Sequence, residues 1–172
     1  MRIISGKYKG KVLDGFNIDG TRPTMDRVKE SIFSIIQGCI KDSVCLDLFA
    51  GSGSLGLESL SNGAKECYFI DKNIEVIKTL KKNLNGVSDA YIINNTFDNF
   101  LKTTNKKFDV IFLDPPYKFN LINKSIDLII ENDLLNDGGI IVCEYETEDV
   151  IDKLNFVKDK KYGSKFVKIY QK

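Results

Sequence analysis

From residue 44 to residue 144 the chain alternates short apolar runs with amphipathic segments of helical spacing. A strand, a helix and a second strand of one sheet form a right-handed crossover, so this rhythm predicts an α/β fold with a mostly parallel sheet. Short apolar runs suit strands that helices cover on both faces. The predicted strands are Val44–Leu48, Cys67–Ile70, Ala90–Ile93, Phe108–Leu113 and Ile140–Glu144. The predicted helices are Leu55–Ser61, Ile74–Leu84, Phe97–Lys102 and Ile122–Glu131.

The C-terminal end departs from this rhythm. Two further apolar segments, Phe156–Lys160 and Phe166–Tyr170, flank Gly163-Ser164. Strand patterns on either side of a short glycine-containing turn predict an antiparallel hairpin. We therefore expect a sheet of seven strands that a C-terminal hairpin closes.

The N-terminal end predicts an appendage and then a long helix. Arg2–Leu13 is broken by glycines and predicts a β-hairpin or an extended arm. Thr24 is the predicted N-cap of a helix from Met25 to about Ile40. The expected division is an N-terminal arm at residues 1–24 and an α/β domain at residues 25–172.

Composition places the chain among globular proteins and argues against several kinds of catalytic and metal-binding site. Its 172 residues are 42% hydrophobic and 28% charged, which predicts a folded domain. The apolar runs are too short to span a membrane and no secretory signal opens the chain, so a cytoplasmic protein without a membrane partner is expected. The chain has no histidine and no C-x-x-C pair. We expect a monomer without a metal ion, whose four cysteines are buried thiols.

A glycine-rich turn follows the first predicted strand. Gly51, Gly53 and Gly56 match G-x-G-x-x-G between a strand and a helix, the context that a nucleotide-binding turn requires. Asp71 lies twenty residues past Gly51, at the end of the next strand, where an acid accepts ribose hydroxyls. NAD and S-adenosylmethionine both fit this pattern. Asp47 favours S-adenosylmethionine, because a carboxylate attracts its cationic amino group and repels a pyrophosphate.

The fourth predicted strand ends in Asp114-Pro115-Pro116-Tyr117. Two prolines fix φ and remove backbone donors, so this loop is stiff and presents acceptors. The Asp114 carboxylate and the Pro115 carbonyl suit the two N–H groups of a planar amine, and Tyr117 offers a surface for a stacked base. The loop, the glycine turn and Asp71 are expected at one edge, since open α/β sheets bind ligands at the carboxyl ends of strands. A simple proline turn is the alternative interpretation.

The net charge of +1 conceals two basic ends around an acidic body. Residues 1–30 carry seven lysines and arginines against four acids, and residues 153–172 carry seven lysines against one acid. A basic rim suits a polyanion, although solvated lysine surfaces give the same pattern. Residues 1–13 contain no acid, which favours contact with RNA phosphates. The expected RNA-binding residues are Lys7, Tyr8, Lys9, Lys11, Arg22 and Arg27.

Together these motifs resemble the class I S-adenosylmethionine-dependent methyltransferases. More narrowly, they resemble the RsmD family, the bacterial guanine-N2 methyltransferases of 16S ribosomal RNA. The resemblance covers nearly the whole chain. Many amino-group methyltransferases share the glycine turn and the Asp-Pro-Pro-Tyr loop, whereas the N-terminal segments are more specific to the family. The matching segments are residues 2–10, Thr21–Thr24, Asp26–Glu30, Asp47–Gly53, Leu55–Glu58 and Asp114–Tyr117.

The resemblance implies a Rossmann-like fold and the transfer of one methyl group to N2 of a guanine in the small ribosomal subunit. The donor would be S-adenosylmethionine, and S-adenosylhomocysteine the product. Whether Asn95, Thr96 or a backbone amide contacts the donor's adenine stays open, because many members carry an acid or asparagine where Thr96 stands. The implied catalytic residues are Asp114, Pro115, Pro116 and Tyr117. The other implied donor-binding residues are Asp47, Phe49, Gly51, Ser52, Gly53 and Asp71, the last often glutamate in the family.

Other functions fit the same residues. Adenine and a glutamine side chain also offer an amino group, so an adenine-N6 methyltransferase of DNA or RNA, or a protein methyltransferase, would carry a similar loop. No separate target-recognition domain is expected here, which counts against a DNA enzyme. A scaffold that binds RNA and S-adenosylmethionine without turnover would keep the donor pocket, but the intact Asp114–Tyr117 loop argues against it.

Overall fold

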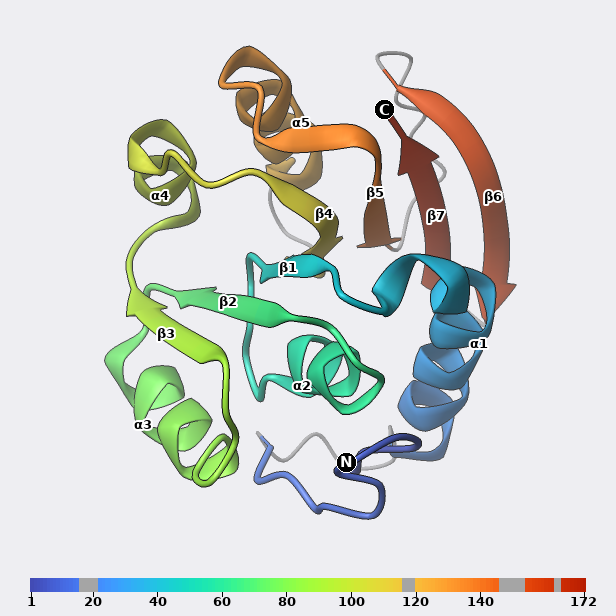
Figure 1. The fold of residues 1–172 in the computed structure, drawn as a ribbon, viewed down its shortest axis with the longest axis vertical. Helices are drawn as coiled ribbons and strands as arrows, with labels where there is room; N and C mark the ends of the chain where they lie inside the picture. Colours follow the sequence, from blue (N-terminus) through green and yellow to red (C-terminus); the bar gives the residue numbers. More distant parts are fainter. Residues whose placement is uncertain (16–21, 116–119, 146–153, 163–164) are drawn as a thin grey trace.

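The computed structural model describes residues 1–15, 22–115, 120–145, 154–162 and 165–172, which build a seven-stranded sheet with helices on both faces (Figure 1). Most boundaries lie within two residues of the predicted ones, and α1 and β5 are the exceptions. The strands are β1 Val44–Asp47, β2 Glu66–Asp71, β3 Ala90–Asn94, β4 Phe108–Leu113, β5 Leu135–Tyr145, β6 Asn155–Tyr162 and β7 Lys165–Gln171. The helices are α1 Arg22–Ile40, α2 Ser54–Ser61, α3 Ile74–Asn83, α4 Phe97–Thr103 and α5 Leu121–Glu131.

The strand order is β3-β2-β1-β4-β5-β7-β6. Strands β1 to β5 pair in parallel, and β7 runs antiparallel to both β5 and β6. The predicted α/β fold with a C-terminal antiparallel hairpin is therefore confirmed. The order reverses between β1 and β4, and open α/β sheets bind ligands at such a switch point.

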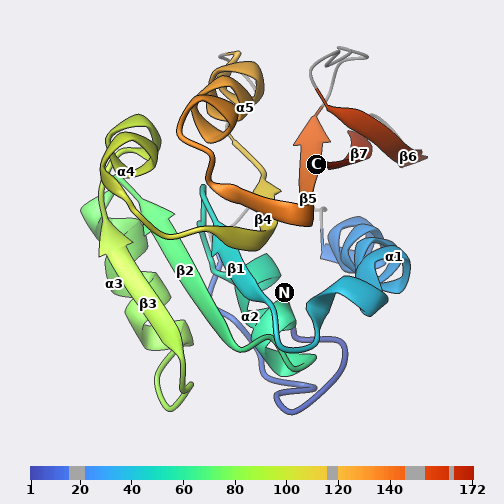
Figure 2. The same ribbon diagram turned by 45° about the horizontal axis from the view of Figure 1, so that its top comes forward.

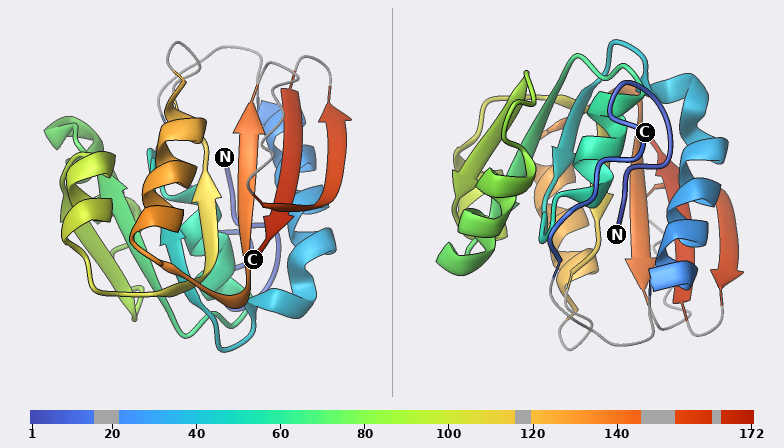
Figure 3. Two further views of the ribbon diagram at one scale, coloured as in Figure 1. Left: turned by 90° about the horizontal axis from the view of Figure 1, so that it is seen from above. Right: turned by 90° about the horizontal axis from the view of Figure 1, so that it is seen from below.

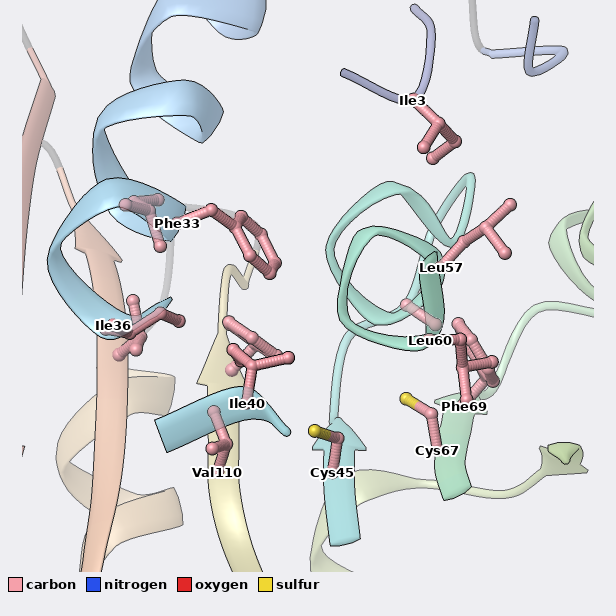
Figure 4. Close-up of a cluster of buried hydrophobic side chains, with 14 of the residues drawn as sticks. Ile3, Phe33, Ile36, Ile40, Cys45, Leu57, Leu60, Cys67, Phe69 and Val110 are labelled. Atoms are coloured by element: carbon pink, nitrogen blue, oxygen red, sulfur yellow. The ribbon is translucent and has the colours of Figure 1, made fainter. Parts of the chain in front are cut away.

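Helices cover both faces of the sheet (Figures 2 and 3). Each face has its own cluster of buried apolar side chains. Side chains alternate between the two faces of a strand, so in β1 Cys45 joins one cluster and Leu46 the other. Figure 4 shows part of the first cluster, to which the N-terminal arm, α1 and α2 contribute Ile3, Phe33 and Leu57. Because these elements share one core, the arm is positioned by the same packing that positions α2.

Helix α1 is longer than predicted. It begins at Arg22, so Thr24 lies inside the helix and is not its N-cap. Pro23 does not prevent this start, because a proline in the first turn lacks only an N–H that has no intrahelical partner. The serine-or-threonine signal therefore misplaced the start of α1.

One of the four cysteines contradicts the prediction of burial. Cys45, Cys67 and Cys143 are buried, and burial raises the pKa of the Cys45 thiol to about 11. Cys39 is exposed on α1. The buried stripe of this helix runs through residues four apart, and Cys39 falls beside that stripe. Its members are Val28, Ile32, Ile36 and Ile40.

The N-terminal arm has the predicted hairpin form with little regular pairing. One antiparallel bridge joins Arg2 to Val12, and the Ile3 N–H donates to the Lys11 carbonyl at 2.9 Å. Gly6 adopts a φ of +75°, and a Cβ there would lie 1.8 Å from the Ser61 carbonyl oxygen of α2. A glycine is therefore required where the arm turns against α2. No helix in the described residues is long and apolar enough to cross a membrane.

Candidate active site

The predicted donor-binding segments and the first two residues of the Asp-Pro-Pro-Tyr loop follow the carboxyl ends of four neighbouring parallel strands. The glycine turn follows β1, and Asp71 is the last residue of β2. Asn95 follows β3, and Asp114 follows β4. The four strands are adjacent in the order β3-β2-β1-β4, so these residues share one edge of the sheet. This edge includes the switch point, as the sequence predicts.

Close packing explains two glycines of the turn. Gly53 has a φ of +80°, and a Cβ there would lie 2.5 Å from Cδ1 of Leu80 in α3. A Cβ at Gly56 would lie 2.3 Å from Cε1 of Phe69 in β2. The glycines thus let the start of α2 approach β2 and α3, which brings the backbone of the turn beside the end of β2.

Asp47, the last residue of β1, is 2% exposed. Its Oδ2 accepts a 2.9 Å hydrogen bond from the Gly56 backbone N–H, in the first turn of α2. Burial raises the pKa of Asp47 to about 7, and the Asp71 charge adds to this, although the Gly56 hydrogen bond opposes it. Within the described chain no lysine or arginine contributes to that pKa. A buried carboxylate without a cationic partner is electrostatically suited to a positively charged ligand group.

Asp71 joins the glycine turn to the start of α3. Its Oδ2 accepts from the Gly51 N–H at 3.3 Å, and its Oδ1 accepts from the Asn73 N–H at 2.9 Å. A carboxylate has about four acceptor sites, so two bonds leave capacity for ligand hydroxyls. Ile74, at the start of α3, is 57% exposed. Sequence reasoning missed this residue, although an apolar residue so close after Asp71 was a signal for an apolar ligand surface.

The third strand end is held by local hydrogen bonds. The Asn95 Oδ1 accepts from the Thr96 N–H and from Nδ2 of Asn99, each at 2.9 Å. The Thr96 hydroxyl is the N-cap of α4 and accepts from the Asn99 N–H at 3.4 Å. Phe49 lies beside this end, with its ring centroid 5.4 Å from that of Phe97. Thr96 thus has a capping role that sequence reasoning did not foresee.

The structure describes half of the Asp-Pro-Pro-Tyr loop. Asp114 is half-buried and Pro115 is buried directly after β4. The rigid base of the loop follows from β4, whose last four residues are all buried. Pro116 and Tyr117 lie outside the described residues.

The predicted RNA-binding residues are distributed over the arm and α1. Lys7 and Lys9 are exposed, and Nζ of Lys7 lies 5.2 Å from the ring centroid of Tyr8. Nζ of Lys11 donates to the Asn85 carbonyl at 3.1 Å, which ties it to the end of α3. Arg27 is exposed on α1. Arg22 is the first residue of α1, but the structure does not describe the Arg22 side chain.

A buried ion pair fixes the arm to the helices, and sequence reasoning missed it. Lys29 of α1 is 4% exposed, and its Nζ lies 3.2 Å from Oε2 of Glu58 in α2. Nζ also donates to the Arg2 carbonyl at 2.6 Å and to Oγ of Ser54 at 2.8 Å. Glu58 accepts from the backbone N–H groups of Ile4 and Ser5. The pair therefore links the arm, α1 and the start of α2.

A second link joins the arm to the glycine turn. Asn83 is 4% exposed at the end of α3. Its Nδ2 donates to the Asp14 carbonyl at 2.8 Å and to the Ser52 carbonyl at 2.9 Å, and its Oδ1 accepts from the Asp14 N–H at 2.9 Å. One side chain thus positions both the end of the arm and the centre of the turn.

Replacing Asn83 with alanine should destabilise the protein by roughly 2–3 kcal/mol, because buried backbone groups lose their partners. Urea denaturation followed by circular dichroism measures the change. Asn85→Ala is the matched control, since the Asn85 side chain is exposed at the same end of α3. Equal stability of both variants would show that the Asn83 hydrogen bonds contribute nothing.

Comparison with known proteins gives relatives that span the whole chain. A family model described as Conserved hypothetical protein 95 matches residues 1–171. Ribosomal RNA small subunit methyltransferase D of Haemophilus influenzae is 40% identical over 180 residues, which covers 99% of this chain and 93% of the relative. The Escherichia coli protein of the same name is 34% identical over 178 residues, covering 100% and 90%.

Solved structures agree with the fold. A candidate methyltransferase of Escherichia coli, yhhF, superposes with a TM-score of 0.89 at 34% identity, covering 100% of this chain and 97% of its own. The N-methyltransferase NodS of Bradyrhizobium japonicum shares the fold alone, with a TM-score of 0.71 at 14% identity over 90% of this chain and 98% of its own.

The sheet order and these neighbours define the fold as that of the class I methyltransferases. Within that class, full-length similarity to the D-type methyltransferases of the small-subunit ribosomal RNA is decisive. The chain belongs to the RsmD family.

Proposed function

We propose that this protein transfers a methyl group from S-adenosylmethionine to the exocyclic N2 of one guanine in 16S ribosomal RNA, acting as a monomer in the cytoplasm. The observation that carries the proposal is the position of Asp114 and Pro115, directly after the buried β4 and at the same edge as the glycine turn, Asp47 and Asp71. Membership of a methyltransferase family supports it. The relatives are named for the small-subunit ribosomal RNA, and this name supports 16S ribosomal RNA as the proposed substrate.

The residues at this edge fit the proposed donor. Asp71 retains acceptor capacity for the ribose hydroxyls, and the exposed Ile74 offers an apolar surface for the adenine. Asn95 and Thr96 lie at the neighbouring strand end. The buried Asp47, beside the glycine turn, fits the cationic amino group. Phe49, Ser52 and the glycines complete the proposed cradle.

When bound, S-adenosylmethionine supplies an electrophilic methyl group on a sulfonium. The guanine amino group is a weak nucleophile, because its lone pair is delocalised into the ring. The Asp114 carboxylate and the Pro115 carbonyl accept hydrogen bonds from its two N–H groups, which orients the lone pair and stabilises the positive charge that develops on nitrogen. Tyr117 holds the base by stacking, roughly 1–3 kcal/mol. The proton leaves to water, so no histidine is needed.

The target base has to leave its stack to reach this edge. Labelled S-adenosylmethionine, small ribosomal subunits that lack the modification and nucleoside mass spectrometry test the assignment. N2-methylguanosine is the expected product. N6-methyladenosine would replace the proposal with an adenine methyltransferase, and the absence of any product would leave a binding scaffold.

Donor affinity should depend on the ionisation of Asp47. With a pKa of about 7 in the free protein, this carboxyl is largely protonated below neutrality. A cationic amino group requires the carboxylate, so donor affinity should fall as the pH drops below about 7, by up to tenfold per unit. Titration calorimetry in buffers of different ionisation enthalpy measures the proton released on binding. Asp47→Asn should abolish this release, and a release that persists would place the titrating group elsewhere.

In the free protein the same raised pKa predicts the opposite pH trend for folding stability. The folded-state pKa of Asp47 is raised above its unfolded value, so its contribution to stability is complete below about pH 4 and is lost as the pH rises through about 7. Asp47→Asn should flatten this part of the stability profile. Urea denaturation over that range provides the readout.

Charge reversal in the arm should weaken RNA binding. Lys7 and Lys9 are exposed, so Lys7→Glu with Lys9→Glu removes two proposed phosphate contacts without disturbing the core. The slope of log affinity against log salt should become shallower by about one per lysine. Filter binding to small subunits measures it. Unchanged RNA binding at low salt would show that the arm does not contact the RNA.

A further inference from the structure

The edge strand β6 carries a basic surface that the proposed active site does not use. It consists of Lys158 and Lys160 of β6 and Arg27 of α1, all exposed, and is called here the α1–β6 surface. Lys158 and Lys160 are two residues apart on a strand and therefore point to the same face of the sheet. Within the described part of the chain, none of the three forms an ion pair.

Contacts through Ser31 join the two elements of this surface. Nζ of Lys160 donates to Oγ of Ser31 at 3.1 Å, and the Tyr162 hydroxyl donates to the same oxygen. Arg27 lies one helical turn before Ser31 and so shares its side of α1. Asp159, which lies between the two lysines, alternates to the opposite face of β6. Glu30 borders a cavity of about 360 Å³ between α1, α2 and the arm.

Strand register aligns this surface with the proposed active site. Leu113 of β4 pairs with Cys143 of β5, and Cys143 pairs with Lys168 of β7. Lys168 in turn pairs with Asp159 of β6. Leu113 and Asp159 are therefore level across the sheet. The next residue toward the carboxyl edge is Asp114 after β4 and Lys160 in β6, so these two residues are level as well. β6 runs parallel to β4 because both β5 and β6 are antiparallel to β7.

Neighbouring strands are about 4.8 Å apart, so the three strand steps from β4 to β6 place the backbone at Lys160 roughly 14 Å from that at Asp114. Figure 1 shows the arrowheads of β4, β5 and β6 pointing in the same direction, with α1 beside β6. A nucleotide held at Asp114 would leave the flanking strand of RNA within reach of this edge.

We infer that the α1–β6 surface is a second RNA-contact site, which binds backbone phosphates of the RNA that flanks the methylated nucleotide. This inference rests on the proposed RNA substrate but not on the identity of the base. Cations that form no ion pair within the described residues suit phosphates, and an edge strand at the level of Asp114 suits RNA entering or leaving the site. Lysines on an edge strand also prevent pairing with another sheet, and that role alone predicts no effect on RNA binding.

The test compares two double variants that make the same change in net charge. Lys158→Glu with Lys160→Glu alters the proposed surface. Lys41→Glu with Lys65→Glu alters exposed lysines just before β1 and β2, at the opposite edge of the sheet. Filter binding to small subunits that lack the modification is measured over about 50–200 mM salt. Titration with S-adenosylmethionine and size-exclusion chromatography report on donor binding and self-association.

The β6 variant should bind small subunits at least about tenfold more weakly, with a salt slope shallower by about two, while its donor affinity is unchanged. The control pair should retain near wild-type binding. Equal losses of RNA affinity in the two variants would overturn the inference, because the change in net charge alone would then explain the loss. Unchanged RNA binding with new self-association in the β6 variant would overturn it in favour of edge protection.

Failure of the proposed function gives a different pattern. If the wild type forms no N2-methylguanosine but the β6 variant still loses RNA affinity, the surface stands and the reaction assignment falls. If the wild type does not bind small subunits, both fall.

Discussion

Asp114→Ala should lower the rate of methyl transfer by at least about a hundredfold while the protein still binds S-adenosylmethionine normally. The basis is its proposed role as an acceptor aimed at charge that develops on the target nitrogen, and loss of one preorganised group of this kind typically costs a factor of 10²–10³ in kcat. Asp114 follows a strand whose last four residues are buried. The backbone at this point should therefore keep its position in the variant.

The measurement is single-turnover methylation of small subunits with saturating donor, together with calorimetric titration of the donor. Asp114→Asn keeps the shape and one acceptor oxygen but removes the charge, so its rate should lie between those of alanine and the wild type. Glu131→Ala, at the exposed end of α5, is the matched control and should transfer methyl groups normally. A wild-type rate for Asp114→Ala would refute the assignment.

The sequence predicts most of this fold because local patterns agree with the tertiary structure. Buried runs such as Phe108–Leu113 became strands at the predicted boundaries. β5 shows where this agreement ends. Asn136–Gly139 has the composition of a turn, yet β5 begins at Leu135. Leu135 pairs with Phe108 and Ile140 pairs with Val110, so an irregular stretch lies between the two pairs. These residues belong to β5 because the residues on either side of them pair with β4.

The candidate site is predictable to the extent that its residues lie at strand ends. Asp47, Asp71 and the glycine turn follow from that rule, because the carboxyl ends of parallel strands meet at one edge. The contacts that hold the arm to this edge do not follow from it. Lys29 and Asn83 reach partners 25 or more residues away in the chain, and a local pattern carries no such information. The burial of Lys29 was unpredictable for the same reason.

Glu58→Gln should destabilise the protein by about 3–5 kcal/mol, the largest effect on stability that we expect. The substitution leaves Lys29 buried without its counter-charge, and an uncompensated buried charge costs far more than an exposed ion pair contributes. The carboxylate also accepts from Ser5 N–H and Oγ, each at 2.9 Å, and glutamine keeps only one acceptor oxygen, so the substitution should loosen the arm as well. Urea denaturation gives the free energy of unfolding, and limited proteolysis reports on the arm.

Three comparisons separate this electrostatic cause from a general weakening. Glu75→Gln breaks an exposed pair with Lys78, in which both side chains are about two-thirds exposed, and should change stability by less than about 0.5 kcal/mol. Lys29→Met with Glu58→Gln should be more stable than Glu58→Gln alone, since no buried cation remains. Burial already lowers the pKa of Lys29. Without Glu58 that pKa falls further, so the deficit of Glu58→Gln should shrink as the pH rises toward about 9. A deficit independent of pH, with no recovery in the double variant, would mean that Glu58 acts through its shape and its hydrogen bonds to the arm alone.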